Sequence, residues 1–401
     1  MTAENLQERG RARLPVELGC PRMQSGLSLI ELMVALTLSL ILLGLVIQVF
    51  ASQRQTFAAG QALARVQENN RFVAELVREP ARALALQGFC GGNARYRNHI
   101  NLVDANQTVF DPRRMVGGWE YAGTGRGASF AVPGNLAPNP ANAGQWTGGA
   151  EPEAAMGALP AQIANRVVPF SDVLLVRELR PVFNNPGSNS VWPQAGSLEF
   201  DEESFDTNLA HGLGQCATVL MTNCVRADVF VNTANAATNL ARDNTGCTPA
   251  NRTGTRWQFF YEDDAHLYHV VAHAFFVGLN TITQEPGFFR VSFDGRANPP
   301  AEELVSGVET LQILYGYGAP SPRGDGQQVD VWMTAAEVPN WELVMAIRLD
   351  AIVRSDASVG TGAVAVQFEI GEGNTVTMPS DRLLRQPVTA TMSLRNRMIT
   401  Q

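Results

Sequence analysis

The stretch from Leu27 to Phe50 constrains this chain more than any other part of it. It reads LSLIELMVALTLSLILLGLVIQVF and is the one run in the 401 residues that is long and apolar enough to cross a bilayer. As an α-helix rising about 1.5 Å per residue it would be roughly 36 Å long, and the hydrocarbon core of a membrane is about 30 Å thick. We therefore predict a membrane-spanning or filament-core helix over residues 27–50.

Glu31 is the one ionisable residue in this run. A carboxylate at the centre of a bilayer costs about 2.5–3.5 kcal/mol, so such a residue usually has a partner. A cut between Gly26 and Leu27 would supply one, because the new α-amino group would lie on the same helix face as Glu31. In a bundle of staggered helices, the amine of one subunit could neutralise the carboxylate of its neighbour. The alternative is an isolated glutamate in an ordinary membrane anchor.

The residues on both sides of this junction form a motif. The string GLSLIE, residues 26–31, resembles the processing signal of type IV prepilins: a glycine, a hydrophobic first mature residue and a glutamate at mature position five. The resemblance implies that prepilin peptidase cuts after Gly26 and methylates the amine of Leu27, which makes residues 1–26 a leader. The first mature residue is Leu where the family more often has Phe. The leader is also long and weakly basic, and Met23 is an alternative start.

A secretory signal peptide is the competing interpretation, because Val49-Phe50-Ala51 could serve as its cleavage site. The apolar run is longer than the about 7–15 residues usual in such signals, and Glu31 would interrupt it. On this interpretation the chain would be an anchored or secreted periplasmic enzyme or receptor. Sequencing of the mature N-terminus separates the two classes.

The helix is expected to continue beyond the membrane segment. Helix-forming composition persists to Glu79, and apolar residues recur there at helical spacing. They are Leu63, Val66, Phe72, Val73, Leu76 and Val77. Pro80 should end or kink the helix. We predict an amphipathic continuation over residues 51–86.

Residues 87–401 are predicted to form a β-rich head. A stretch rich in Gly and Pro, around residues 101–169, is expected to consist of surface insertions. Later runs with β-forming composition predict a mainly antiparallel sheet. They are Ser171–Glu178, Ala217–Asn223, Ala227–Thr233, Trp257–Tyr261, Leu267–Val277, Gly287–Phe293, Thr310–Tyr317, Trp341–Val353, Ala363–Ile370 and Thr389–Leu394. The predicted fold class is α+β, with a long N-terminal helix as the spine of this head.

Four cysteines follow the apolar run: Cys90, Cys216, Cys224 and Cys247. An even number fits two disulfides in an exported domain, with three possible connectivities that the sequence leaves open. The paired C-x-x-C spacing typical of zinc sites is absent. No metal site is predicted from the cysteines.

Charge and composition exclude other functions. The net charge is −8, so the chain has no overall positive field to attract nucleic acid, and no direct nucleic-acid binding is predicted. All 30 basic residues are Arg, which excludes lysine Schiff-base chemistry and a P-loop lysine. No complete catalytic or dinucleotide motif is present. The sequence therefore predicts neither an enzyme nor a cofactor.

Two local patterns resemble binding sites. His266, His269 and His273 would form a metal-binding face on a helix, but their neighbours favour a strand, which would distribute them over two faces. The Arg323-Gly324-Asp325 tripeptide lies in a turn-like stretch and is interpreted as a plain turn. Residues 325–330 lack the ligand pattern of an EF-hand loop, so no calcium site is predicted.

Several later strings resemble, in the same order, the PilW family of minor pilins. They are ENNRF (68–72), SDVLLVR (171–177), NCVRADVF (223–230), FFVG (275–278), ELVSGVETLQILYG (303–316), WELVMAIRLDAIVRS (341–355) and LLRQPVTATMSLRNRM (383–398). The family has cysteines near the end of its helix and before the ADVF-type strand, which match Cys90 and Cys224. Cys216 and Cys247 look like additions.

The resemblance implies a minor pilin-like structural subunit for the assembly or priming of a type IV pilus. Its expected partners are prepilin peptidase, other minor and major pilins, and the inner membrane. It implies a single-pass inner-membrane protein with a periplasmic head, later carried on the pilus at the cell surface. A type II secretion pseudopilin would share the leader and the helix, and the PilW-like strings favour the pilus.

Overall fold

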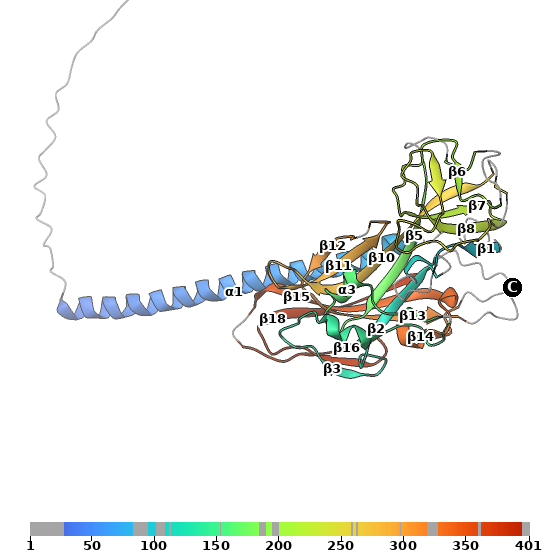
Figure 1. Cartoon of the computed structure of the whole chain (residues 1–401). Coiled ribbons are helices and arrows are strands. Elements are labelled where there is room, and N and C mark those ends of the chain that lie inside the picture. The colour runs from blue at the N-terminus through green and yellow to red at the C-terminus, as the bar shows by residue number, and fades with distance from the viewer. Residues whose placement is uncertain are drawn as a thin grey trace, which may run out of the picture. The chain divides into compact units, whose positions relative to one another are not determined.

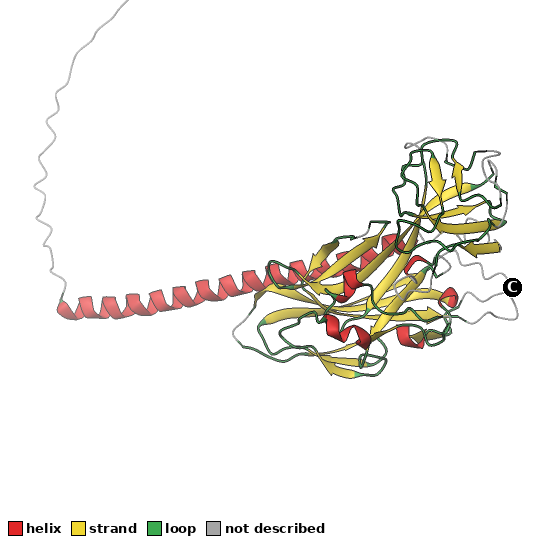
Figure 2. Cartoon of the chain, in the orientation of Figure 1, coloured by secondary structure: helices red, strands yellow, loops and turns green. Residues whose placement is uncertain are grey.

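The computed structural model describes residues 28–82, 95–101, 109–111, 114–152, 154–183, 190–194, 200–257, 260–261, 264–296, 298–318, 328–359 and 362–394. The chain divides into two compact units, residues 1–56 and 57–401. Helix α1 (Leu29–Arg82) contributes to both units. The predicted α+β class, one long N-terminal helix with a mainly antiparallel β head, is confirmed (Figure 2).

In the second unit, α1 packs on the head through one face. Val66, Val73 and Val77 are fully buried, and their spacing of seven and four residues places them on one side of the helix. Leu63 and Phe72, from the same predicted stripe, remain 36% and 41% exposed. Helix α1 is described as far as Arg82, two residues after Pro80, and residues 83–86 lie outside the described part of the chain.

A nine-stranded sheet is the largest element of the head (Figure 1). Its strand order is β1-β8-β7-β10-β5-β2-β4, with β11 beside β10 and β12 beside β11. The strands are β1 (Arg95–Asn98), β2 (Val116–Tyr121), β4 (Trp146–Thr147), β5 (Val173–Pro181), β7 (Thr218–Thr222), β8 (Arg226–Val231), β10 (His266–Leu279), β11 (Pro286–Phe293) and β12 (Ala301–Ser306). Strand β10 is central, because β5 pairs with one edge while β7 and then β11 pair with the other. All pairings except β1 with β8 are antiparallel.

A second, fully antiparallel sheet has the order β14-β13-β15-β18. Its strands are β14 (Val331–Met333), β13 (Val308–Tyr317), β15 (Val344–Ser358) and β18 (Leu383–Ser393). Two small sheets complete the head: β16 (Gln367–Ile370) with β17 (Asn374–Thr377) and β3 (Ser129–Ala131), and β6 (Ser204–Asp206) with β9 (Asn239–Ala241). The short helices are η2 (Pro140–Gln145), α3 (Ala161–Ala164), η3 (Ala335–Glu337) and η4 (Trp341–Leu343).

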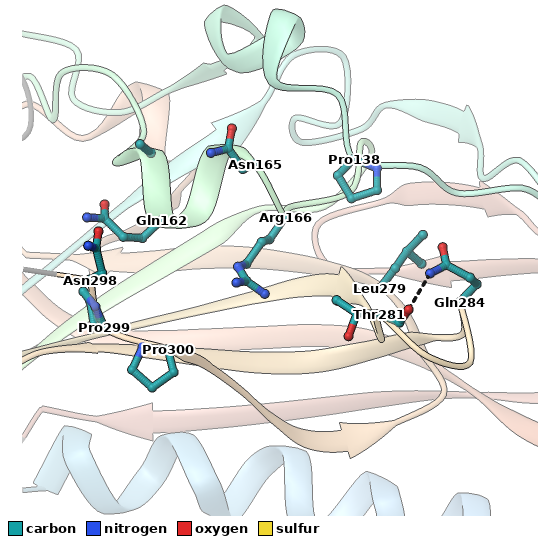
Figure 3. Close-up of a pocket in the computed structure, with 11 residues that line it drawn as sticks. Pro138, Gln162, Asn165, Arg166, Leu279, Thr281, Gln284, Asn298, Pro299 and Pro300 are labelled. Carbon is teal, nitrogen blue, oxygen red and sulfur yellow. Dashed lines mark hydrogen bonds between the residues drawn. The ribbon is translucent and has the colours of Figure 1, made fainter.

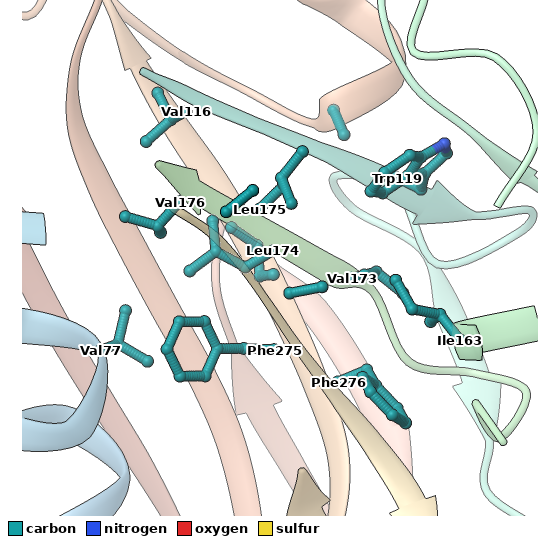
Figure 4. Close-up of a cluster of buried hydrophobic side chains, with 14 of the residues drawn as sticks. Val77, Val116, Trp119, Ile163, Val173, Leu174, Leu175, Val176, Phe275 and Phe276 are labelled. Carbon is teal, nitrogen blue, oxygen red and sulfur yellow. The ribbon is translucent and has the colours of Figure 1, made fainter. Parts of the chain in front are cut away.

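Strand β10 is buried on both faces, and its successive side chains alternate between two layers. Phe275 points toward Val77 of α1, whereas Phe276 points to the opposite face, toward Ile163 of α3 (Figure 4). Both rings are fully buried, which contributes about 1.5–3 kcal/mol each. The main sheet therefore separates the α1 side of the head from the α3 side.

A smaller lobe of the head has its own core. Phe205, Phe230 and Trp257 meet edge to face in this core, beside β6, β7, β8 and β9. Cys216, just before β7, forms a disulfide with Cys247, which follows β9. The disulfide thus closes the segment that carries most of the strands of this lobe.

Some expectations differ from the structure. Within the stretch expected to form surface insertions, β2 is a fully buried strand of the main sheet. Its glycines suggested a loop, but a Cβ at Gly118 would lie 2.6 Å from the carbonyl oxygen of Val173, so the strand needs glycine to approach β5 and β13. Trp257 and Tyr261 are buried outside any strand. The run expected from Trp341 begins with η4, and the strand starts at Val344.

Candidate functional site at the start of the N-terminal helix

The first turn of α1 is closed by a capping box. The backbone N–H of Ser28 donates to Glu31 Oε2 at 3.1 Å, and the backbone N–H of Glu31 donates to Ser28 Oγ at 3.2 Å. Each bond satisfies an amide that would otherwise have no partner at the helix start. The carboxylate also lies at the positive end of the helix dipole. Glu31 therefore has a partner within its own chain.

This partner was missed at the level of sequence, where only an amine was considered. The signal was readable, because a serine three residues before a glutamate, at the start of an apolar run, is the signature of a capping box. Gly26 and Leu27 lie outside the described residues. The cleavage site itself therefore remains a prediction, and the described part of the chain begins one residue after Leu27.

The following turns of α1 present an almost wholly apolar surface. Leu29, Leu40 and Phe50 are 79%, 66% and 61% exposed. Exposed apolar area costs about 25 cal/mol per Å² in water, so a surface of this extent indicates contact with lipid or with another protein. Among the described residues, α1 is the one helix long and apolar enough to span a membrane.

The two hydroxyl groups inside this surface are satisfied by the helix itself. Thr37 Oγ1 donates to the carbonyl oxygen of Val34 at 2.9 Å, and Ser39 Oγ donates to that of Leu36 at 2.9 Å. Such bonds remove the cost of placing a hydroxyl in hydrocarbon. Neither residue therefore opposes insertion of the helix into a membrane.

The three histidines considered for a metal site all lie on β10, where strand geometry separates them. His269 and His273 share one face, and His266 points to the other. His273 bonds Glu178 at 3.0 Å and Ser292 at 2.9 Å. The hydrogen bond from His273 is the main cause that lowers the pKa of Glu178 to about 2. Among the described residues, no group of three His, Cys, Asp or Glu side chains is placed to hold a metal ion.

The structure describes three of the four cysteines that follow the apolar run. Cys216 and Cys247 are bonded to each other, and Cys224 is disulfide-bonded as well. Cys90 lies outside the described residues, as does the Arg323–Asp325 turn. The pairing of Cys224 remains a prediction.

A buried polar cluster escaped the sequence analysis. Asp228 bonds His99 at 2.6 Å and the Tyr261 hydroxyl at 2.6 Å, and His99 also bonds Thr255 at 2.8 Å. His99, Asp228 and Tyr261 are fully buried, and desolvation is the main cause that lowers the pKa of His99. The cluster joins the end of β1 to β8 and to the segment around Thr255, so it cross-links the smaller lobe.

Asp172 and Glu120 form a second buried polar group, between the two large sheets. Asp172 accepts hydrogen bonds from the backbone N–H groups of Tyr121 at 3.0 Å and Ile313 at 2.9 Å. It is also hydrogen-bonded to Glu120. Burial is the main cause that raises the pKa of both carboxyl groups. This pair links β2 to β13 within the core.

Two family models match parts of the chain, and one of them covers the start of α1. Residues 21–47 match the model of the prokaryotic N-terminal methylation motif, and residues 274–396 match that of the type IV pilus-assembly protein W family. No curated protein matches the chain. A solved type IV-like pilin from Thermus thermophilus is 18% identical over 32% of this chain, with a TM-score of 0.22. The match spans 66% of that pilin, just under two thirds of its length.

The two family matches lie at opposite ends of the chain and concern different features. The first covers the capping box and most of the exposed apolar part of α1. The second begins within β10 and extends through the last strand, β18. Over these residues the chain is similar to the type IV pilus-assembly protein W family and to proteins with a prepilin-type N-terminus, and the two matches support a minor pilin-like subunit of a type IV pilus.

Proposed function

We propose that the chain waits in the inner membrane as a precursor, is cut by prepilin peptidase after Gly26, and then enters a type IV pilus or its priming complex through α1. The observation that carries the proposal is the position of Glu31, a lone carboxylate in the first turn of an exposed apolar helix. The methylation-motif match over residues 21–47 supports the same junction.

The capping box leaves the carboxylate able to take a second partner. Glu31 Oε2 accepts the Ser28 N–H at 3.1 Å, and an ionised carboxylate has about four lone-pair positions for donors. After cleavage, the N-methylated amine of Leu27 in a neighbouring subunit would bring a positive charge to this helix end. Pairing it with Glu31 neutralises both charges in an apolar environment, where either alone is costly.

The partners proposed on this basis are other minor and major pilins, and the processing enzyme. The head would face the periplasm before assembly and lie at the cell surface afterwards. The PilW match over residues 274–396 favours a pilus over a type II secretion system. The proposed role is structural, because it requires only that α1 packs against other helices. The cleavage and methylation of the chain are carried out by prepilin peptidase.

Mass spectrometry of the mature N-terminus tests the proposal. Protein from its native host should begin with N-methylated Leu27, and protein from a host lacking prepilin peptidase should keep residues upstream of it. A mature chain that begins at Ser52 would instead identify a secretory signal peptide. An intact leader in the presence of the peptidase would also contradict the proposal.

A further inference from the structure

A cleft on the head falls outside everything assigned above. It has a volume of about 570 Å³ and lies between α3, the turn from β10 to β11 and the segment before β12 (Figure 3). Sites for small molecules usually measure about 300–1,000 Å³. The cleft is therefore large enough for a ligand the size of one or two sugar rings.

The cleft lies on the sheet face opposite α1. Phe276 points to the α3 face, where Ile163 covers it, and Phe275 points to Val77 of α1 on the other face (Figure 4). Within the second unit, the cleft and the buried stripe of α1 therefore lie on opposite faces of the sheet. A ligand would reach the cleft from solvent in the free subunit.

The walls of the cleft are held by hydrogen bonds. Val167 forms a bridge with Gly278, and Val168 N–H donates to the carbonyl oxygen of Val277 at 3.0 Å, which fixes the segment after α3 to β10. In the opposite wall, Gln284 Nε2 donates to the carbonyl oxygen of Thr281 at 3.0 Å (Figure 3). A preformed site loses less conformational entropy when a ligand binds.

The lining has a definite chemical character. Four carboxamides, each with donors and an acceptor, line the cleft: Gln162, Asn165, Gln284 and Asn298. Arg166 is the one charged residue of the lining, and its guanidinium extends from the segment after α3 toward the strands (Figure 3). Among the described residues, no carboxylate lies within ion-pair distance of it. The lining contains no acidic and no aromatic side chain, and Pro138, Pro299 and Pro300 supply rigid apolar surface.

This composition disfavours several ligand classes. A metal cation would need carboxylates, which the lining lacks. A nucleic acid or polyphosphate would need several cationic groups, and the lining has one. A purely apolar ligand would cover the carboxamides of Gln162, Asn165 and Asn298 without offering them hydrogen bonds. One guanidinium among neutral carboxamides fits a ligand with a single carboxylate and many hydroxyls.

We propose that the cleft binds an acidic sugar, a hexuronate unit of a surface polysaccharide. Its carboxylate pairs with Arg166, because a guanidinium offers two parallel N–H donors to the two carboxylate oxygens. Its hydroxyls exchange hydrogen bonds with Gln162 and Asn298, which both line the cleft (Figure 3). The proline rings pack against the C–H groups of the sugar. The inference does not depend on the pilus role of the chain.

Isothermal titration calorimetry on the full chain tests the proposal, in a polyoxyethylene detergent because glycoside detergents carry sugars of their own. The probes are digalacturonate, one of whose two carboxylates would pair with Arg166, its dimethyl ester, and the peptide acetyl-Gly-Gly-Glu, which also carries two carboxylates. Digalacturonate should bind saturably. The ester keeps the hydroxyls but lacks the charge, so it should bind at least about tenfold more weakly. The peptide, which has the carboxylate without the hydroxyls, should bind at least tenfold more weakly than digalacturonate.

Two variants locate the site. Arg166→Gln should weaken digalacturonate binding about tenfold or more, and it leaves the fold intact because the Arg166 side chain is exposed. Arg382→Gln, which removes an equal charge from an exposed arginine outside the lining, should bind as the wild type does. Absence of saturable digalacturonate binding would overturn the proposal, as would unchanged affinity in Arg166→Gln or a peptide that binds as tightly as the sugar. Processing at Gly26 is untouched by these variants, so failure here leaves the pilus proposal standing.

Discussion

Ser28 and Glu31 cap one another at the start of α1, through two backbone-to-side-chain hydrogen bonds of 3.1 and 3.2 Å. This relationship gives Glu31 a local structural role in addition to the proposed pairing with a neighbouring amine. The two roles are separable. Capping needs a hydrogen-bond acceptor at position 31, whereas pairing with an amine needs a negative charge there.

Substitution at the two capping residues distinguishes these roles. Glu31→Gln keeps a residue suited to a capping box but removes the charge, so membrane insertion should persist while incorporation into pili falls about tenfold or more. Ser28→Ala removes the hydroxyl acceptor at a cost of about 0.5–2 kcal/mol at the helix start but keeps the carboxylate, so incorporation should persist. Immunoblots of membrane and sheared pilus fractions give both readouts.

Glu68→Gln is the matched control for these variants. Glu68 is an exposed carboxylate on the same helix, and its neutralisation should leave incorporation unchanged. Wild-type incorporation of Glu31→Gln, together with a loss in Ser28→Ala, would show that capping alone explains the need for position 31. The proposed charge pairing would then be wrong.

The buried pair of Glu120 and Asp172 predicts a pH dependence. Burial, followed by the negative charge of Asp172, raises the pKa of Glu120 far above its ordinary value of 4.5. When folding raises the pKa of a carboxyl group, the group contributes its full stabilisation at any pH below the pKa of the unfolded state. This contribution is lost as the pH rises toward the pKa of the folded state. The free energy of unfolding should therefore fall between pH 7 and pH 9, by up to about 1.4 kcal/mol per pH unit.

Urea unfolding at pH 7, 8 and 9 measures this slope, and Glu120→Gln should remove most of it. The interval lies above the titration of His99, His211 and His269, because burial lowers the pKa of each from its ordinary value of 6.5. Glu342→Gln, at an exposed carboxylate, should keep the wild-type slope. An identical slope in wild type and Glu120→Gln would show that Glu120 is not the group responsible.

Disulfide mapping tests the cysteine assignments. Trypsin alone leaves Cys216 and Cys224 in one peptide, because no Arg or Lys lies between them, so chymotrypsin must be added. Non-reducing digests should contain one linked pair from Cys216 and Cys247, and we predict a second from Cys90 and Cys224. A peptide linking Cys90 to Cys216 or Cys247 would contradict this pairing. Cys216→Ser with Cys247→Ser should lower the free energy of unfolding by about 2–4 kcal/mol.

Local features of the sequence were sufficient for the helix and the strand-rich head. The apolar run from Leu27 and the spacing of Val66, Val73 and Val77 each depend on residues within a few turns of one another, so their patterns are visible in the chain itself. The same holds for β5, β10 and β13, whose apolar runs lie close to the predicted bounds. The capping box was equally local, and was missed only because Glu31 was interpreted for its charge.

Tertiary structure alone decided the features that depend on distant residues. Gly117 and Gly118 suggested a loop, yet they allow β2 to approach Val173, more than fifty residues later in the chain. The cleft around Arg166 combines four segments separated in sequence, and its carboxamides carry no motif. Glu120 and Asp172 share a hydrogen bond only because β2 and β5 are adjacent in the sheet. Periodicity records which face of an element is buried, but the pairing of one element with another is fixed only when the whole core packs.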